Sequence, residues 1–186
     1  MENILKKVPG IQMSFHCSKQ DKFTTVSPQH IEYDSFKKAF PDNFFDWQFT
    51  IVRNPYDRIV SEYNMKKEEG ISFAAFVRAA LKRYKVFPHT RDNHIRPQSD
   101  FLSPSMAIYK LEDGLQIPIS KACEKLNISS GFELRHDRKS KQSKPYKLKD
   151  TLRVKILNHY KKDFELFNYN PDVLPDTIKL VTEDFL

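Results

Sequence analysis

The stretch at 46–64, which reads DWQFTIVRNPYDRIVSEYN, contains the clearest structural pattern of the chain. Residues 49–52 are aromatic or β-branched, which favours a buried strand, and Asn54 and Pro55 then end it. Proline suits the first turn of a helix, and apolar residues recur after it at helical spacing. The sequence therefore predicts a strand, a short turn and a helix, with Arg53 at the end of the strand.

The predicted turn has the properties of an anion site. A helix that begins at Pro55 points its free backbone N–H groups, and the positive end of its dipole, toward the strand end. Arg53 adds a planar guanidinium that binds phosphate through two hydrogen bonds, and Ser61 can add a hydroxyl two turns along. The alternative is an ordinary strand-turn-helix in which Arg53 pairs with a surface carboxylate.

This stretch resembles the 3′-phosphate-binding segment of sulfotransferases that use 3′-phosphoadenosine 5′-phosphosulfate (PAPS). The similarity is strongest to the branch that includes carbohydrate sulfotransferases and their bacterial relatives. In that family a strand ends in Arg-Asn/Asp-Pro and a helix with Arg, Ser and often Tyr follows. The matching residues are Arg53, Asn54, Pro55, Arg58, Ser61 and Tyr63. The resemblance implies that Arg53 and Ser61 hold the 3′-phosphate, and it places Arg58 among the cofactor-binding candidates.

The family also has a loop of the form Pro-Lys-x-Gly/Ala-x-Thr-Ser that holds the 5′-phosphosulfate, and residues 1–45 match it poorly. Lys19, with two threonines shortly after it, is the candidate for the catalytic lysine. Such a lysine neutralises the charge that develops on the bridging oxygen as the sulfuryl group leaves. The alternatives are a solvated surface lysine at 19 and a second candidate at Lys7, which is followed by Gly10.

The loop at 87–102, FPHTRDNHIRPQSDFL, is dense in histidine, arginine, aspartate and asparagine, which are residues typical of binding loops. It resembles a His-Trp-x-Pro-like segment of the family through His94 and Pro97. An acceptor hydroxyl must lose its proton, and an imidazole can take it near neutral pH. His94 is therefore the first candidate for the catalytic base, with His16 and His30 behind it. The alternative is a structural histidine bonded to backbone.

Other basic residues are candidates for binding acidic groups. Arg91 and Arg96 of the same loop could bind such groups on the acceptor. Residues 135–147 hold six cations against one aspartate, which is typical of a solvated loop. The resemblance implies a basic loop here that closes over the nucleotide and adds three weaker cofactor-binding candidates: Lys141, Lys144 and Tyr146.

The order of predicted elements indicates an α/β fold with a parallel sheet and helices on both faces. Besides the central strand, the patterns predict helices at 28–40, 72–84, 117–126 and 148–167 and a strand at 108–111. Ligands of such sheets bind at the carboxyl ends of the strands. The resemblance implies the P-loop nucleotide-kinase-like sulfotransferase fold, or that fold with a shortened N-terminal part. We expect one domain over 1–186, with 170–186 as a tail.

Composition restricts the partners and the compartment. A formal charge of +7 favours an anionic partner without choosing among nucleotide, glycan, nucleic acid and membrane surface. Nucleic acid is not expected, because no recognised nucleic-acid motif accompanies the basic run. No apolar run approaches the roughly 20 residues of a membrane span, and no signal-peptide core is present, so we expect a cytoplasmic protein. Cys17 and Cys123 lack metal-ligand spacing; they are expected to be reduced or buried, and no metal site is predicted.

These features together predict a PAPS-dependent sulfotransferase that moves a sulfuryl group to a hydroxyl of a carbohydrate. PAPS is then the donor and a glycan the acceptor. The alternative is a non-catalytic sulfotransferase-like protein that binds adenosine bisphosphate or a polyanion such as a sulfated glycan or nucleic acid. The sequence does not identify the acceptor or the oligomeric state.

Overall fold

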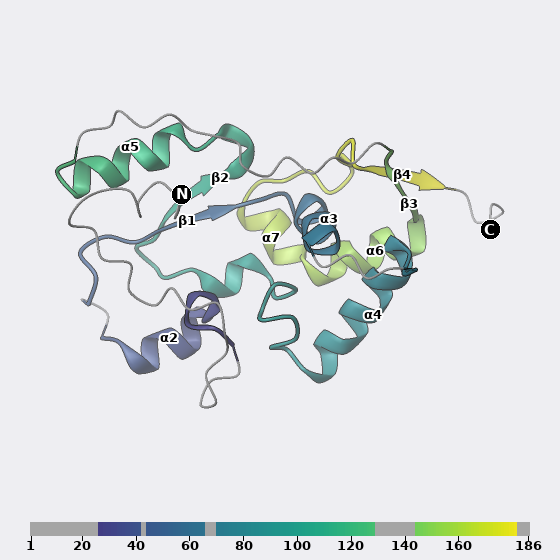
Figure 1. Cartoon of the computed structure of the whole chain (residues 1–186), viewed down its shortest axis with the longest axis horizontal. Helices are drawn as coiled ribbons and strands as arrows, with labels where there is room; N and C mark the ends of the chain where they lie inside the picture. Colours follow the sequence, from purple (N-terminus) through teal and green to yellow (C-terminus); the bar gives the residue numbers. More distant parts are fainter. Residues whose placement is uncertain (1–25, 42–43, 66–69, 129–143, 182–186) are drawn as a thin grey trace.

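A computed structural model of the chain describes residues 26–41, 44–65, 70–128 and 144–181 (Figure 1). Its elements in chain order are η1 (Pro28–His30), α2 (Tyr33–Ala39), β1 (Phe49–Val52), α3 (Pro55–Met65), α4 (Phe73–Val86), η2 (Gln98–Phe101), β2 (Ala107–Lys110), η3 (Leu111–Asp113), α5 (Gln116–Lys125), β3 (Tyr146–Lys149), α6 (Asp150–His159), α7 (Lys161–Leu166) and β4 (Ile178–Val181). None of the helices within these ranges is long and apolar enough to cross a membrane.

The strands form two parallel pairs. β1 pairs with β2 in a register that joins Phe49 to Ala107, and β3 pairs with β4 in a register that joins Tyr146 to Ile178. Parallel partners need crossover connections, and helices supply both: α3 and α4 lie between β1 and β2, and α6 and α7 between β3 and β4. The predicted α/β class with parallel strands is confirmed. Within the described ranges the four strands make two separate pairs, β1 and β2 left of centre and β3 and β4 on the right in Figure 1.

One apolar core joins the helices to the second strand pair. The helix stripes predicted by the sequence bury Ile59 and Val60 on α3, and Phe76, Val77 and Leu81 on α4. They pack in one cluster with buried residues of β3, α6, α7 and β4. Burial of this surface is the main favourable contribution to folding, at about 25 cal/mol per Å² of apolar area. The core therefore holds α3, and with it the turn that precedes α3, in a fixed place.

Several local predictions are confirmed. The central strand is β1, and the helix after Pro55 is α3. The helix predicted from Ser72 is α4, and the Ser72 Oγ accepts a hydrogen bond from the Ala75 N–H at 3.3 Å, as an N-cap should. The strand predicted near 108–111 is β2, and it pairs with β1 as expected. Cys123 is buried and free, whereas Cys17 lies outside the described residues.

Two predicted helices differ from the structure. Residues 148–149 of the helix predicted at 148–167 belong to β3, because Leu148 is fully buried opposite Leu180 of β4. The rest of that helix is divided at Tyr160 into α6 and α7. The helix predicted at 28–40 is η1 followed by α2, since Ser27 bonds to Asp92 instead of capping a helix. Part of the predicted tail forms β4.

Asp163 of α7 connects the core to the strand end at Arg53. Its carboxylate is fully buried and accepts hydrogen bonds from the backbone N–H groups of Gln98 at 2.7 Å and Ser99 at 2.8 Å. These groups lie at the start of η2, where helical N–H groups lack intrahelical partners. The Gln98 side chain then accepts from the Arg53 N–H at 2.9 Å and donates to the Arg53 carbonyl at 2.8 Å. Asp163 thus fixes η2, and Gln98 fixes the end of β1.

We expect the Asp163→Ala variant to lose about 2–4 kcal/mol of unfolding free energy, because it leaves two buried N–H groups without acceptors. Urea denaturation followed by circular dichroism measures this loss. Glu165→Ala is the matched control. Glu165 is exposed on the same helix, and among the described residues its carboxylate pairs only with Lys161 at the surface, so its replacement should change stability by less than about 0.5 kcal/mol. Equal stability of both variants would contradict the role of Asp163.

Candidate functional site

The turn between β1 and α3 lies where the sequence predicted it and is fixed by its own residues. The Asn54 Oδ1 accepts a hydrogen bond from the Tyr56 N–H at 2.9 Å, which satisfies one free donor of the helix start. The Asn54 N–H donates to Glu112 Oε1 at 2.7 Å, and the other oxygen of Glu112 accepts from the Tyr169 hydroxyl at 2.8 Å. Segments beyond β2 and α7 therefore hold the turn in place.

The Arg53 guanidinium is left available by this arrangement. Gln98 contacts only the Arg53 backbone, and no hydrogen bond or ion pair joins the Arg53 guanidinium to another described residue. Its charge does act on Asp57 of α3. Burial raises the pKa of the Asp57 carboxyl, and the Thr177 hydroxyl and the Arg53 charge offset only part of this rise. Within the described ranges the surface ion pair that was the alternative for Arg53 is not formed.

The other two cofactor candidates of α3 have different surroundings. Ser61 is exposed and lies four residues after Asp57, so the two side chains share one face of the helix. Arg58 donates to the Arg96 carbonyl and lies over the Tyr160 ring at 6.0 Å. Ser61 is therefore open to a ligand, whereas Arg58 connects α3 to the loop that carries His94.

That loop contains three successive residues in the left-handed region. The φ angles of Arg91, Asp92 and Asn93 are 54°, 56° and 63°. This backbone conformation is uncommon for residues other than glycine and is stabilised here by side-chain bonds. Asp92 accepts from Ser27 at 2.6 and 2.7 Å, and the Asn93 side chain donates to the His30 carbonyl at 2.8 Å. The sharp bend joins the loop to the segment before α2.

The bend places His94 against a buried carboxylate. The His94 Nδ1 lies 2.7 Å from Glu62 Oε2, and Arg91 Nε donates to Glu62 Oε1 at 2.7 Å. Burial raises the pKa of Glu62, but the hydrogen bonds from His94 and Arg91 outweigh it, and the pKa ends below its ordinary value. In the neutral form of His94, the ionised carboxylate favours the tautomer with the proton on Nδ1, which leaves a lone pair on Nε2. A histidine held in this tautomer can act as a general base.

A second histidine candidate lies beside the first. The rings of His30 and His94 meet edge to face, with centroids 4.5 Å apart, and His30 Nδ1 lies 2.7 Å from Asp92 Oδ2. Burial raises the pKa of Asp92, but bonds from Ser27 and His30 outweigh it and lower the pKa overall. The structure thus unites two candidates that are 64 positions apart. Sequence reasoning missed Glu62 and Asp92, since no local pattern distinguishes them from surface acids.

The remaining candidates are dispersed. The Arg91 guanidinium contacts Glu62 and lies over the Phe76 ring at 4.8 Å, and Arg96 donates to Asn93 and Asp100 at 3.1 and 3.3 Å. Arg91 is therefore bound to α3 and packed against α4, whereas Arg96 is bound within its own loop.

Of the weaker cofactor candidates, Lys144 is exposed just before β3. Tyr146 packs against the core: its ring stacks on Phe73 at 4.9 Å and its hydroxyl donates to Asn64. Lys19, Lys141 and the third histidine, His16, lie outside the described residues. The roles of these residues stay predictions.

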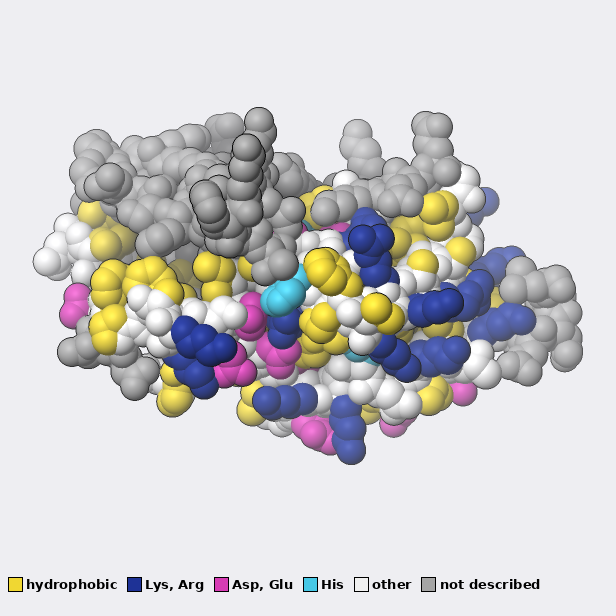
Figure 2. All heavy atoms as spheres, turned by 90° about the horizontal axis from the view of Figure 1, so that it is seen from below, with side chains coloured by type: hydrophobic (Ala, Val, Ile, Leu, Met, Phe, Trp, Pro, Cys, Tyr) yellow, Lys and Arg dark blue, Asp and Glu magenta, His cyan; other side chains and the backbone are white. Residues whose placement is uncertain are grey.

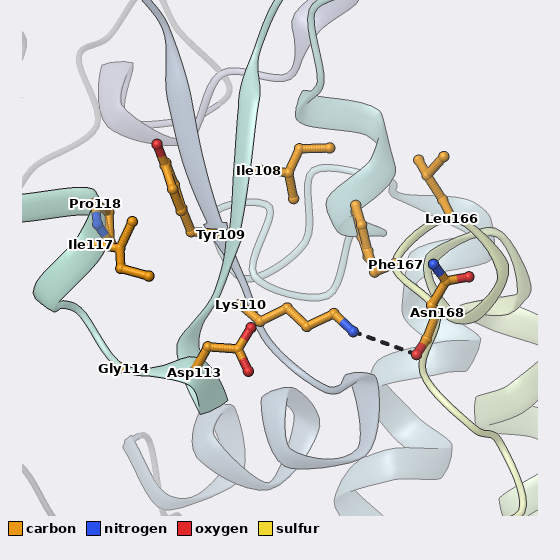
Figure 3. Close-up of a pocket in the computed structure, with 10 residues that line it drawn as sticks. All are labelled: Ile108, Tyr109, Lys110, Asp113, Gly114, Ile117, Pro118, Leu166, Phe167 and Asn168. Carbon is orange, nitrogen blue, oxygen red and sulfur yellow. Dashed lines mark hydrogen bonds between the residues drawn. The ribbon is translucent and has the colours of Figure 1, made fainter. Parts of the chain in front are cut away.

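A hollow of about 300 Å³ lies beside β2, between α5 and the end of α7 (Figure 3). Apolar side chains of Ile108, Ile117 and Leu166 surround it, and Lys110 extends across it to donate to the Asn168 carbonyl at 3.5 Å. None of its lining residues is one of the candidates above. No sequence pattern predicted this hollow.

His159 anchors the His94 loop from the core side, and its burial predicts an acid-sensitive contact. Its Nε2 donates to the Ile95 carbonyl at 3.0 Å, and its ring meets the Tyr84 ring edge to face. Burial lowers the pKa of His159, and the opposing effects of the Ile95 carbonyl and of Asp163 are smaller. Arg58 acts in the same direction as burial, while Asp100 opposes it.

Because the folded pKa of His159 lies below the unfolded value of about 6.5, the unfolded state binds the proton more readily. The contribution of neutral His159 to stability is complete above that value and is lost as the pH falls below it. We expect the His159→Gln variant, which keeps an N–H donor, to lose less stability between about pH 7.5 and about pH 5.5 than the parent chain. Urea denaturation at the two pH values measures this. Parallel losses in both proteins would contradict the assignment.

Comparison with known proteins adds three findings. A sequence model of the Sulfotransferase family matches residues 12–170, which include β1, α3 and the His94 loop. No curated protein matches the chain. Among solved structures, the crystal structure of a sulfotransferase from Alicyclobacillus acidocaldarius is similar at 17% identity and a TM-score of 0.38, with 74% of this chain and 59% of that chain covered. The chain thus spans less than two thirds of that neighbour.

Proposed function

The chain belongs to the sulfotransferase family, and we propose that it transfers a sulfuryl group from PAPS to a hydroxyl group of a carbohydrate. Family membership supports sulfuryl transfer in general; the donor and the acceptor are our proposal. The observation that carries it is the 2.7 Å contact between His94 Nδ1 and the buried Glu62 carboxylate. It orients an imidazole with a free Nε2, as proton removal from a hydroxyl requires.

In the proposed reaction His94 takes the proton of the acceptor hydroxyl while the hydroxyl oxygen attacks sulfur. The bond between sulfur and the bridging phosphate oxygen breaks, and adenosine 3′,5′-bisphosphate leaves with the bonding electrons. Glu62 stabilises the imidazolium that forms, because its carboxylate already holds Nδ1. Lys19 is proposed to neutralise the leaving oxygen.

Arg53 supports PAPS as the donor. Its guanidinium lies at the carboxyl end of a parallel strand, directly before a helix, and makes no hydrogen bond to the described residues. Ligands of parallel α/β folds bind at such ends, and a guanidinium matches the geometry of a phosphate. Ser61 is exposed on the same helix and is proposed as its partner on the 3′-phosphate. Arg58, Lys144, Tyr146 and Lys141 are weaker candidates for the nucleotide.

The charge of the chain supports an acidic glycan as the acceptor. Figure 2 shows Lys and Arg side chains gathered over one side of the face drawn, where acidic side chains are fewer. With a net charge of +7, the surface attracts polyanions over several ångströms of solvent. Arg91 and Arg96, which flank His94, are the proposed contacts for acidic groups of the acceptor.

Calorimetric titration with adenosine 3′,5′-bisphosphate, and then with PAPS, tests this function. A ligand at 100 times its dissociation constant should add about 2.7 kcal/mol of stability, which is visible as a raised melting temperature. Binding of both ligands, followed by sulfation of an oligosaccharide in an acceptor screen, would support the proposal. Binding of the bisphosphate alone would indicate a non-catalytic relative, and binding of neither would refute the nucleotide site.

A further inference from the structure

Three metal-binding side chains converge beside the proposed base. One ligand atom each from His30, Asp92 and His94 lies within 4.8 Å of the ligand atoms of the other two, and all three residues are partly buried. Two imidazoles and one carboxylate form a donor set that Zn²⁺ takes in three-ligand sites, with a water molecule in the fourth position. We propose that these three residues bind a Zn²⁺ ion, and that the ion and the acceptor hydroxyl compete for Nε2 of His94.

The Glu62 carboxylate orients the His94 ring for metal binding. Histidine ligands of metals usually donate their other ring N–H to a carboxylate or carbonyl, which fixes the tautomer and raises the basicity of the ligating nitrogen. The Glu62 carboxylate, 2.7 Å from His94 Nδ1, stands in that relation to His94. Glu62 is almost fully buried and also accepts from Arg91, so its orientation is fixed independently of any ion.

Asp92 is held in an equally defined position. Its Oδ1 accepts the Ser27 N–H at 2.6 Å, and its Oδ2 accepts the Ser27 hydroxyl at 2.7 Å and lies 2.7 Å from His30 Nδ1. A carboxylate has about four lone-pair sites, so these bonds leave capacity for an ion. The Asn93 side chain, which donates to the His30 carbonyl, keeps the two segments together. The ligands are therefore assembled before any ion arrives.

The distances between the three ligand atoms are compatible with Zn²⁺ binding after a small side-chain movement. Ligand atoms of a tetrahedral site lie about 3.3 Å apart when each is about 2.0–2.1 Å from Zn²⁺. The His30 and His94 side chains are partly exposed. Small rotations of these side chains can therefore bring the ligand atoms, which lie within 4.8 Å of one another, to that spacing. Nitrogen donors favour Zn²⁺ over Mg²⁺ and Ca²⁺, which prefer all-oxygen sites. The site should therefore discriminate strongly between these ions.

Binding would have a functional consequence that rests on the proposed function. With Nδ1 bonded to Glu62, Nε2 is the nitrogen of His94 that remains to ligate, and it is also the nitrogen proposed to accept the hydroxyl proton. Both cannot occur at once on one lone pair. Zn²⁺ should therefore inhibit sulfuryl transfer, and a chelator should restore it.

Metal binding is tested on the full chain without a histidine tag, by calorimetric titration with ZnCl₂ and by the visible spectrum with Co²⁺. We expect one Zn²⁺ per chain, a four-coordinate Co²⁺ spectrum, and no comparable heat with MgCl₂. His30→Gln and Asp92→Asn should each weaken Zn²⁺ binding at least about 10-fold, and Glu62→Gln about 10- to 100-fold. His89→Gln is the matched control, because His89 lies in the same loop outside the cluster and should leave affinity unchanged.

The outcomes separate this inference from the proposed function. Equal Zn²⁺ affinity of the parent, His30→Gln and Asp92→Asn proteins would overturn the site. A six-coordinate Co²⁺ spectrum of the parent protein would also overturn it, and this second test does not depend on the folding of any variant. Thermal melting confirms that each variant is folded. Zn²⁺ that fills the site without slowing transfer would overturn the competition at His94. A chain without transfer activity would contradict the proposed function, while the calorimetry would still decide the metal site.

Discussion

Replacement of Arg53 by alanine is expected to raise the dissociation constant for adenosine 3′,5′-bisphosphate at least about 100-fold. The reason is the loss of two charge-assisted hydrogen bonds, which together contribute about 3 kcal/mol. Folding should be little affected, because Gln98 holds Arg53 through its backbone N–H and carbonyl, which alanine retains. Calorimetric titration measures the affinity, and urea denaturation should show a change below about 0.5 kcal/mol.

Two further variants sharpen this experiment. Arg53→Lys keeps the charge and loses the planar fork, so it should bind with an affinity between those of the parent chain and the alanine variant. Arg78→Ala, at an exposed position of α4, removes one positive charge without touching the turn and serves as the matched control. If Arg53→Ala and Arg78→Ala weakened binding equally, the effect would be one of net charge, and the site at the end of β1 would be wrong.

Replacement of His94 by glutamine is expected to lower kcat by about 100- to 10,000-fold, the usual contribution of a general base. The affinity for adenosine 3′,5′-bisphosphate should stay the same, because His94 is proposed to act on the acceptor and not on the nucleotide. The glutamine amide can still donate to the buried Glu62 carboxylate, which limits the loss of stability. A sulfuryl-transfer assay with PAPS, together with calorimetry, measures both quantities.

The same assay on His89→Gln supplies the control, since that histidine belongs to the loop but contacts neither Glu62 nor His30 in the bonds described. A kcat for His94→Gln within tenfold of the parent value would refute His94 as the base. Loss of nucleotide affinity in the same variant would instead indicate that His94 supports the cofactor site.

Local sequence patterns predicted the elements whose formation depends on near neighbours. The β-branched run before Asn54 is β1, and proline after it begins α3. Ser72 caps α4 through its own hydroxyl. The second half of β3, at 148–149, was mistaken for the start of a helix because β3 acquires its conformation from β4, about thirty residues later in the chain. Intrinsic propensity is weaker than such ladder pairing, as strand formation generally depends on partners.

Local sequence likewise predicted some features of the candidate site and not others. The position of Arg53 at a strand end and the presence of His94 in a polar loop follow from the sequence, because turn and strand signals span only a few residues. The sequence also supplied the basic surface and the family resemblance that the match over residues 12–170 confirms.

The contacts of these residues depend on tertiary packing and could not be predicted from local sequence. Packing of the loop against α3 brings Glu62 to His94, and the bend at 91–93 brings Asp92 to His30. These partners are separated by 32 and 62 positions, and contacts of that range form only when a shared core fixes both segments at once. The contacts of the proposed base and of the proposed metal ligands therefore depend on the fold, while the residue types that they use are properties of the sequence.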